Sequence, residues 1–231
     1  MNRGFTNIAR FIMDELIPPV IRDSSWFMYP FYYFAYNGKN IREKMNFKSL
    51  VKNFTEEEYI NFYAGLDSIS RNRKTDLSES NIKYILKNID PSSSNLLDAG
   101  CGRGYLLQKI KQRYPDIKLS GLDVVNKLDD QAINFTEGYI SKMPFADDEF
   151  DTVICTHTIE HLLNLQQGID ELVRVTKNQL IIVTPCQKYF YYTLDEHINF
   201  FPKKELLTSL FPFKNFVCKK INYDWVYIGY K

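Results

Sequence analysis

The feature that most restricts the fold of this chain is a short apolar run that ends in an acid and a glycine-rich turn. Leu96 and Leu97 precede the sequence D-A-G-C-G-R-G at residues 98–104, and a helical apolar pattern begins directly after it. Glycines at alternating positions permit a sharp strand-to-helix turn and let a ligand lie against bare backbone near the positive end of the helix. The pattern therefore predicts a ligand-binding strand–loop–helix unit.

A second acid narrows the choice of ligand. Asp123 follows a predicted strand at residues 117–122, where a carboxylate can bind both hydroxyls of a ribose. A dinucleotide fingerprint would be G-x-G-x-x-G with no acid before it, whereas here the spacing is G-x-G-x-G and Asp98 precedes it. An acid at that point favours a cationic group, and the ammonium and ribose of S-adenosylmethionine match Asp98 and Asp123. Taken singly, Asp98 could instead be a helix cap and Asp123 a loop acid.

From Ser78 onward, strand and helix patterns alternate. Ser78 can cap a helix that ends before Pro91, and further helices are predicted at residues 166–176 and 203–210. The predicted strands lie at 96–97, 117–122, 133–135, 152–155, 180–183, 216–221 and 225–228, with a hairpin joining the last two. Such alternation requires crossover connections, so it predicts an α/β fold with a mostly parallel sheet.

Residues 1–77 follow a different pattern. Apolar residues from Phe5 to Leu16 are spaced for one face of a helix, and T-E-E-E at 55–58 has the form of a capping box before another helix. Aromatic residues make up 15% of the chain, and eight of them fall in the eleven residues from Trp26 to Tyr36. We expect 1–77 to be a helical, aromatic extension that forms a lid on the substrate side, and 78–231 to be the cofactor-binding domain.

Composition excludes several classes of protein. The 29 Lys and Arg residues against 28 Asp and Glu give a net charge of +1, which is unlike a protein that coats a nucleic acid polymer. Four cysteines lie far apart with no C-x-x-C pair, which suits neither a structural zinc site nor a disulfide framework. No run of about 18 uncharged apolar residues occurs. We expect a cytoplasmic protein without a transmembrane segment; peripheral membrane contact and the oligomeric state stay open.

Three motifs together resemble the class I S-adenosylmethionine-dependent methyltransferases over residues 78–231. Residues 95–105 resemble the first motif of the family, M-P-F-A-D-D-E-F-D-T-V-I at 143–154 resembles the run into its fourth strand, and H-T-I-E-H-L at 157–162 resembles the segment that follows. The resemblance implies a Rossmann-like seven-stranded sheet with a C-terminal antiparallel hairpin. It also implies that the cofactor, whose product is S-adenosylhomocysteine, contacts Asp98, Ala99, Gly100, Gly102, Asp123, Val124, Tyr139, Ile140 and Thr156, with Tyr139 and Ile140 beside the adenine.

Methyl transfer is an in-line displacement at a sulfonium, so the protein supplies alignment and, for a hydroxyl acceptor, a base. All three histidines fall at the edge of the sheet where ligands bind in this architecture. The family often has a histidine before an aromatic pair, so His197 is the first candidate for the base and His157 the second. His161, beside Glu160, is interpreted as a structural residue. No metal is expected, although D-E-H at 195–197 is an exception to keep in view, and an anionic acceptor would need no base.

The sequence constrains the identity of the methyl acceptor less than that of the cofactor. Tyr189, Tyr191 and Tyr192 are expected either to line the acceptor pocket or to pack for stability. Arg73 is expected either to bind a phosphate or the cofactor carboxylate, or to be part of a solvated surface run. The extension, the run at 73–76 and H-I-N-F-F at 197–201 resemble bacterial enzymes that decorate surface polysaccharides. This implies O-methylation of a small polar acceptor, such as a sugar hydroxyl or a phosphate or phosphoramidate group on a nucleotide-linked precursor of a capsule. A quinone or lipid acceptor and a non-catalytic binding protein are the alternatives.

Overall fold

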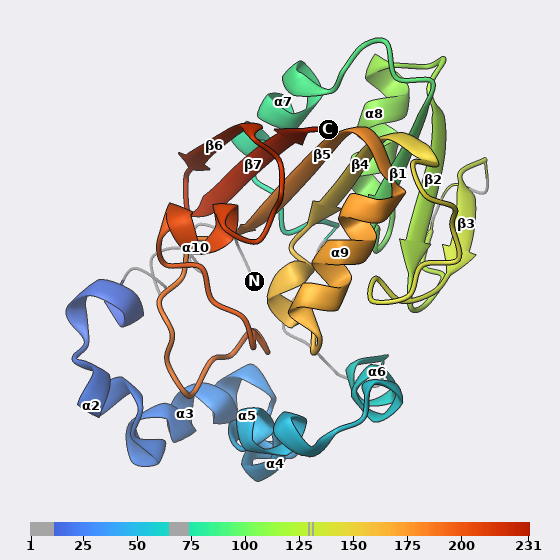
Figure 1. Cartoon of the computed structure of the whole chain (residues 1–231). Helices are drawn as coiled ribbons and strands as arrows, with labels where there is room; N and C mark the ends of the chain where they lie inside the picture. Colours follow the sequence, from blue (N-terminus) through green and yellow to red (C-terminus); the bar gives the residue numbers. More distant parts are fainter. Residues whose placement is uncertain (1–11, 65–73, 129, 131) are drawn as a thin grey trace.

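A single seven-stranded sheet forms the centre of the computed structural model, which describes residues 12–64, 74–128, 130 and 132–231 (Figure 1). The strand order is β3-β2-β1-β4-β5-β7-β6, and β7 pairs antiparallel with both of its neighbours while the other pairs are parallel. The strands are β1 Asn95–Ala99, β2 Lys118–Asp123, β3 Asn134–Glu137, β4 Phe150–Thr156, β5 Thr176–Pro185, β6 Asn215–Ile221 and β7 Asp224–Tyr230. The predicted seven-stranded sheet with its C-terminal antiparallel hairpin is confirmed.

Helices cover both faces of the sheet because its strands are apolar on both sides. Leu97 and Val153 face one apolar cluster together with α9 (Leu165–Val175) and α10 (Lys204–Thr208). Their neighbours in the chain, Leu96 and Ile154, face the opposite apolar cluster together with α7 (Glu79–Asn88) and α8 (Tyr105–Arg113). Side chains alternate across a strand, so a run of consecutive apolar residues can serve both layers at once.

The sheet register brings three loops together at one edge. Asp98 pairs with Gly121 of β2 and with Ile154 of β4, so β1, β2 and β4 end at nearly the same level. The Gly100 amide also donates to the Leu122 carbonyl at 2.7 Å, which fixes the start of the glycine loop against β2. The carboxyl ends of parallel strands are the usual place for a ligand in an open α/β sheet.

The N-terminal part is a set of short helices that lies below the sheet in Figure 1. Its elements are η1 Ile12–Leu16, α2 Pro19–Arg22, α3 Ser25–Ala35, α4 Ile41–Met45, α5 Phe47–Leu50, η2 Val51–Asn53 and α6 Glu56–Ala64. The aromatic segment forms α3, which runs through Pro30 and buries Met28 and Tyr32, four residues apart, against the loop that follows β5. Most of the predicted helix from Phe5 lies outside the described residues.

Hydrogen bonds to main-chain carbonyls join these helices to the loop between β5 and α10. Tyr32 donates to the Thr193 carbonyl at 2.7 Å, and the buried Lys48 ammonium donates to the Phe190 carbonyl at 2.6 Å. Tyr36 donates to a carboxylate oxygen of Glu196 at 2.7 Å. A loop tied at its main chain by buried donors keeps one conformation, because each lost bond would leave a buried polar group unpaired.

Two predicted helix starts are confirmed by their caps. The Ser78 hydroxyl accepts the Asn81 amide at 3.1 Å. Thr55 and Glu58 form a reciprocal capping box at the start of α6, with bonds of 2.8 and 3.2 Å. The helix predicted at 203–210 is shorter, because α10 ends at Thr208. None of the helices in the described part of the chain has the length and apolar character needed to cross a bilayer.

Candidate functional site

A cavity of about 520 Å³ lies at the sheet edge where the loops after β1, β2 and β4 meet. Nine of the residues that the sequence assigns to the site line it: Asp98, Gly100, Gly102, Asp123, Val124, Tyr139, Ile140, Thr156 and His157. Ala99, also assigned to the cofactor, is fully buried in the sheet core and is not among the residues that line the cavity, so its contact with the cofactor stays a prediction. The structure therefore brings residues from four separate segments to one cavity, as the strand order requires.

The glycine loop presents bare backbone to this cavity. Gly100 and Gly102 have φ values of +81° and +53°, in the left-handed region where side chains are strained. A Cβ atom on Gly100 would lie 2.3 Å from the Thr158 hydroxyl oxygen, so this position has no room for a side chain. A Cβ atom on Gly102 would have no heavy atom within 4 Å, which shows that the space in front of Gly102 belongs to the cavity.

Asp98 is a buried acid at the wall of the cavity. Among the described residues, its Oδ1 atom has no hydrogen-bond partner. Burial, together with the nearby Asp123 carboxylate, raises the pKa of Asp98 to about 7. An unpartnered buried carboxylate is costly unless a cation or a donor reaches it. The cavity therefore fits a ligand that carries a positive group at this point.

Asp123 is held in place by the glycine loop. Its Oδ2 accepts the Gly102 amide and its Oδ1 accepts the Val124 amide, both at 2.8 Å. Burial raises the pKa of Asp123, and these amide bonds oppose that effect. Each carboxylate oxygen keeps capacity for a further bond, so the side chain is oriented to accept hydroxyl donors from the cavity. The paired acids and the glycine backbone fit the ammonium, ribose and methionine chain of S-adenosylmethionine.

His157 follows β4 in the left-handed conformation, with φ of +51°. Its Nδ1 lies 3.4 Å from Glu160 Oε1 and its Nε2 lies 3.6 Å from Asp224 Oδ2. Burial alone would lower the pKa of His157, but the Asp224 and Glu160 carboxylates raise it to about 10. A ring that is already protonated at neutral pH cannot accept a proton. This geometry is unlike that of a general base, and the catalytic role of His157 stays a prediction.

His197, the first candidate for the base, is 6% exposed and is not among the residues that line the cavity. Its Nδ1 lies 2.6 Å from Gln187 Oε1 and 3.2 Å from Asp195 Oδ2. His161 does line the cavity, and its ring lies 4.8 Å from that of His197, centroid to centroid. Burial alone would raise the pKa of the adjacent Glu160, but the neighbouring imidazoles, His157 first, lower it. The base assignment of His197 is not settled by this arrangement and stays a prediction.

The predicted acceptor residues lie away from the cavity. Tyr192 packs on Tyr32 of α3, the Tyr191 hydroxyl shares a 2.5 Å bond with Ser49, and Tyr189 is 56% exposed. Arg73 lies outside the described residues, whereas Lys74 lines the cavity. The expectation that these tyrosines and Arg73 bind the acceptor stays a prediction.

Residues of the N-terminal part that sequence reasoning did not assign to the site also line the cavity. Glu56 and Tyr59 of α6 reach it, and the Glu56 carboxylate accepts a bond from Ser141. The Tyr59 hydroxyl donates to the His161 carbonyl at 2.6 Å. The capping box located α6 along the chain, but no local signal shows which distant surface a helix will meet.

Comparisons with known proteins agree with this geometry. The model of a family described as "Methyltransferase domain" matches residues 97–183. Over 101 residues the chain is 30% identical to ajmaline N-methyltransferase of Rauvolfia serpentina, covering 38% of this chain and 34% of that protein. Over 94 residues it is 30% identical to demethylmenaquinone methyltransferase of Deinococcus radiodurans, covering 36% and 39%. The chain thus spans little more than a third of the length of either relative.

A solved structure is similar over a larger share. It is an S-adenosylmethionine-dependent methyltransferase of Thermotoga maritima, described as a possible histamine N-methyltransferase. The two share 18% identity and a TM-score of 0.51 over 66% of this chain and 88% of that one. Together with the strand order, this similarity shows that the chain has the class I methyltransferase fold.

Proposed function

We propose that this protein is a methyltransferase that uses S-adenosylmethionine. The observation that carries the proposal is Asp98, a buried acid whose Oδ1 has no hydrogen-bond partner among the described residues, beside open space at Gly102. Asp98 would hold the ammonium group and Asp123 the ribose, with the adenine near Tyr139 and Ile140 and the methionine chain near Thr156. The cofactor supplies a methyl group on a sulfonium, and the protein aligns an acceptor with it.

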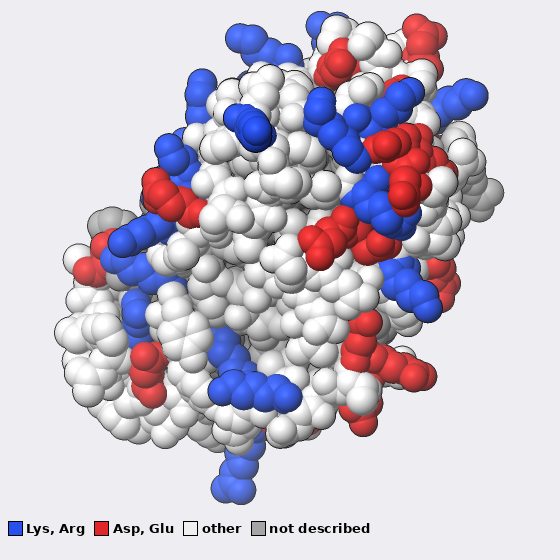
Figure 2. Space-filling model, in the orientation of Figure 1, with Lys and Arg blue, Asp and Glu red and all other residues white. Residues whose placement is uncertain are grey.

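The acceptor end of the cavity supports a small polar acceptor. Polar side chains of Glu56, Ser141, Thr158 and His161 line the cavity. On the face in Figure 2, positive and negative side chains are interspersed, with no continuous basic stripe of the kind that binds a nucleic acid polymer. We infer O-methylation of a sugar hydroxyl, or of a phosphate or phosphoramidate group, on a nucleotide-linked precursor of a bacterial surface polysaccharide, in the cytoplasm.

A second candidate is a quinone or lipid acceptor at a membrane surface. On α3, the Trp26 and Phe34 side chains are 72% and 79% exposed, and Tyr29 and Tyr33 are about half exposed. Exposed aromatic residues of this kind suit the boundary between lipid headgroups and acyl chains. One similar protein is a demethylmenaquinone methyltransferase. In this case α3 would bring the chain to the membrane that holds the acceptor.

Binding and transfer experiments test these proposals separately. Calorimetry with S-adenosylhomocysteine should give a saturable signal for the wild type, and Asp123→Asn should weaken it about 10-fold or more by removing a charged hydrogen-bond acceptor. Asp151→Asn is the matched control, because Asp151 is a buried acid bound to Ser94 and does not line the cavity. Equal affinity in all three proteins, or binding of NADH in place of S-adenosylhomocysteine, would contradict the cofactor assignment.

The acceptor is identified by transfer of a labelled methyl group. Nucleotide-linked sugars and phosphoramidates form one panel, and demethylmenaquinone in anionic vesicles forms the other. Label in the first panel supports the polar acceptor, and label in the second supports the quinone acceptor. Tight binding of S-adenosylhomocysteine with no labelled product from either panel or from cell extracts would favour a non-catalytic binding protein.

A further inference from the structure

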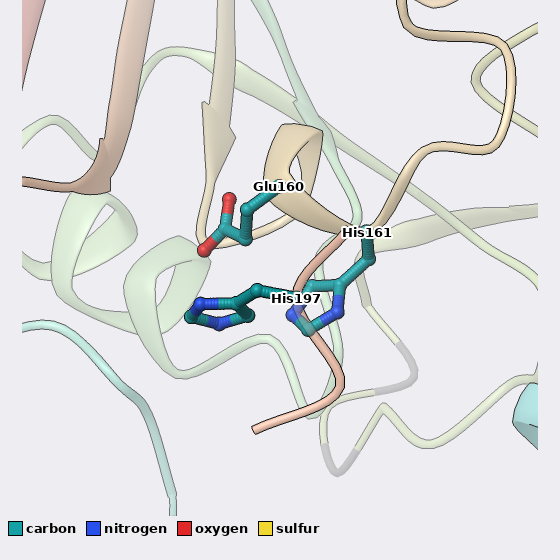
Figure 3. A group of neighbouring side chains, drawn as sticks. All are labelled: Glu160, His161 and His197. Carbon is teal, nitrogen blue, oxygen red and sulfur yellow. The ribbon is translucent and has the colours of Figure 1, made fainter. Parts of the chain in front are cut away.

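Glu160, His161 and His197 form a compact cluster beside the cavity (Figure 3). Glu160 and His161 belong to η3 (Ile159–His161), the short helix after β4, whereas His197 lies in the loop between β5 and α10. One donor atom from each of the three side chains lies within 4.8 Å of a donor atom of each of the other two. Glu160 and His197 are buried, and His161 lines the cavity.

We propose that Glu160, His161 and His197 bind one divalent transition-metal ion at the acceptor end of the cavity. Two nitrogen donors and one carboxylate form a donor set that suits Zn²⁺, Mn²⁺ or Fe²⁺, whereas Mg²⁺ and Ca²⁺ prefer oxygen donors alone. Three protein ligands leave a coordination position for a further oxygen, as in catalytic rather than structural metal sites.

The hydrogen bonds of both histidines favour this role. His161 Nδ1 lies 3.2 Å from the Glu196 carbonyl oxygen, and His197 Nδ1 lies 2.6 Å from the Gln187 side-chain oxygen. Both oxygens can only accept, so Nδ1 is the protonated nitrogen in each ring and a neutral ring carries its lone pair on Nε2. Metal-binding histidines are oriented in the same way, by donating the other ring N–H to a protein oxygen.

The Glu160 carboxylate is oriented as well. Its Oε2 accepts the Thr184 hydroxyl at 3.2 Å, and His157 Nδ1 lies 3.4 Å from Oε1. The Glu160 side chain is 1% exposed, and a charge buried to this degree is stabilised by cations and hydrogen bonds. His157 and Thr184 would therefore act as positioning residues behind the carboxylate ligand.

Only small movements would close the site around an ion. A tetrahedral ion with bonds of about 2.0–2.1 Å sets its donor atoms about 3.3 Å apart. The present limit of 4.8 Å therefore requires inward shifts of about an ångström. Rotation of the His161 and His197 side chains would have to supply these shifts, because buried donors hold the main chain of the loop that carries His197.

The ion would act on the acceptor, and this role rests on the proposed methyltransferase function. His161 lines the cavity, so an ion bound to it would lie at the cavity wall, where the acceptor could take the remaining coordination position. An acceptor hydroxyl bound there has a lowered pKa and loses its proton to water. The alkoxide oxygen then forms a bond to the methyl carbon while the bond from that carbon to sulfur breaks, leaving neutral S-adenosylhomocysteine. No histidine is then required as a base.

Metal binding is measured directly on the full chain. Protein stripped with a chelator is dialysed against Zn²⁺, and separately against Co²⁺, whose visible absorption reports nitrogen and oxygen ligands. The wild type and the control Asp151→Asn should bind about one ion per chain. His161→Gln and His197→Gln should bind at least about 100-fold more weakly and lose the Co²⁺ absorption. Far less than one ion per wild-type chain, or variants that bind as tightly as the wild type, would overturn the proposal.

Affinity for S-adenosylhomocysteine separates this proposal from the preceding one. The metal-free wild type and both histidine variants should bind S-adenosylhomocysteine as the loaded wild type does, which also shows that the variants are folded. Metal binding without affinity for S-adenosylhomocysteine would contradict the proposed function and leave the metal site standing. Affinity for S-adenosylhomocysteine without metal binding would contradict the metal site alone.

Discussion

Replacing Asp98 with asparagine should stabilise the ligand-free protein and weaken its binding of S-adenosylhomocysteine. Burial raises the pKa of Asp98 from an ordinary value of 3.8 to about 7. When folding raises the pKa of a carboxyl group, that group destabilises the folded state at every pH at which it is ionised in the unfolded chain. The penalty is therefore absent below pH 3.8, grows up to pH 7 and is constant above it. It reaches about 4 kcal/mol at pH 8 and is less than half of that at pH 5.

Asparagine remains a buried polar group, so we expect it to relieve about half of this penalty. A gain of about 2 kcal/mol at pH 8 corresponds to an increase in Tm of about 4–8 °C for a chain of this size, with less than half of that increase at pH 5. A charge-assisted hydrogen bond to an ammonium group is worth about 1.5–3 kcal/mol, so the affinity for S-adenosylhomocysteine should fall about 10- to 150-fold.

Thermal melts at pH 5 and pH 8, together with calorimetric titration, measure both effects. Asp151→Asn is again the control. The Ser94 amide and hydroxyl bind Asp151 at 2.8 and 2.6 Å and lower its pKa. Its removal should lower the Tm and leave ligand affinity unchanged. An Asp98→Asn protein with wild-type affinity, or with the same increase in Tm at both pH values, would refute the assignment of Asp98 as the buried partner of a cationic ligand.

Four further variants, one of them with a control, test other parts of the structure. Gly100→Ala should lower the Tm strongly, because the added Cβ would meet Thr158. Gly102→Ala should lower the stability by only about 1–2 kcal/mol and should mainly weaken ligand binding. Equal losses of Tm in the two variants would contradict this geometry. Tyr36→Phe removes the hydrogen bond to Glu196 and should lower the stability by about 1–3 kcal/mol. The loss should be seen as faster proteolysis between the N-terminal helices. Tyr33→Phe, at an exposed tyrosine, is the control. His157→Gln leaves two buried carboxylates without their cation and should cost about 3–5 kcal/mol. Because the pKa of His157 is raised to about 10, its contribution is complete below pH 6.5 and is lost as pH rises through 10, so a constant difference in Tm from pH 7 to 10 would contradict this account.

The acids and glycines that line the cavity were predictable because their sequence signals are local. A strand followed by an acid and alternating glycines constrains its own backbone, and Asp98, Gly100 and Gly102 all line the cavity as expected. Asp123 and Thr156 join them because parallel strands end at one edge of the sheet. Strand order and residue type were sufficient for this part.

The packing of the loop after β5 could not be predicted in the same way. Tyr189, Tyr191 and Tyr192 follow β5, and their role in acceptor binding stays a prediction. The buried Lys48 and Tyr32 bind the main chain of that loop and hold it against the N-terminal helices. A hydrogen bond from a lysine ammonium to a carbonyl far away in the chain produces no periodic sequence pattern from which it could be predicted. Likewise, the sequence located His197 beyond β5 but could not place it beside Glu160 and His161.

The sequence by itself determined the α/β sheet, the antiparallel end of that sheet and the acids and glycines that line one part of the cavity. Each of these depends on hydrophobic period, turn chemistry or the alternation of strands and helices, which can be read from short segments of the chain. Only the tertiary structure decided that α6 supplies cavity residues, that α3 buries one face and exposes the other, and that Glu160, His161 and His197 converge. These depend on contacts between segments far apart in the chain, where the packing of whole surfaces decides which side chains meet.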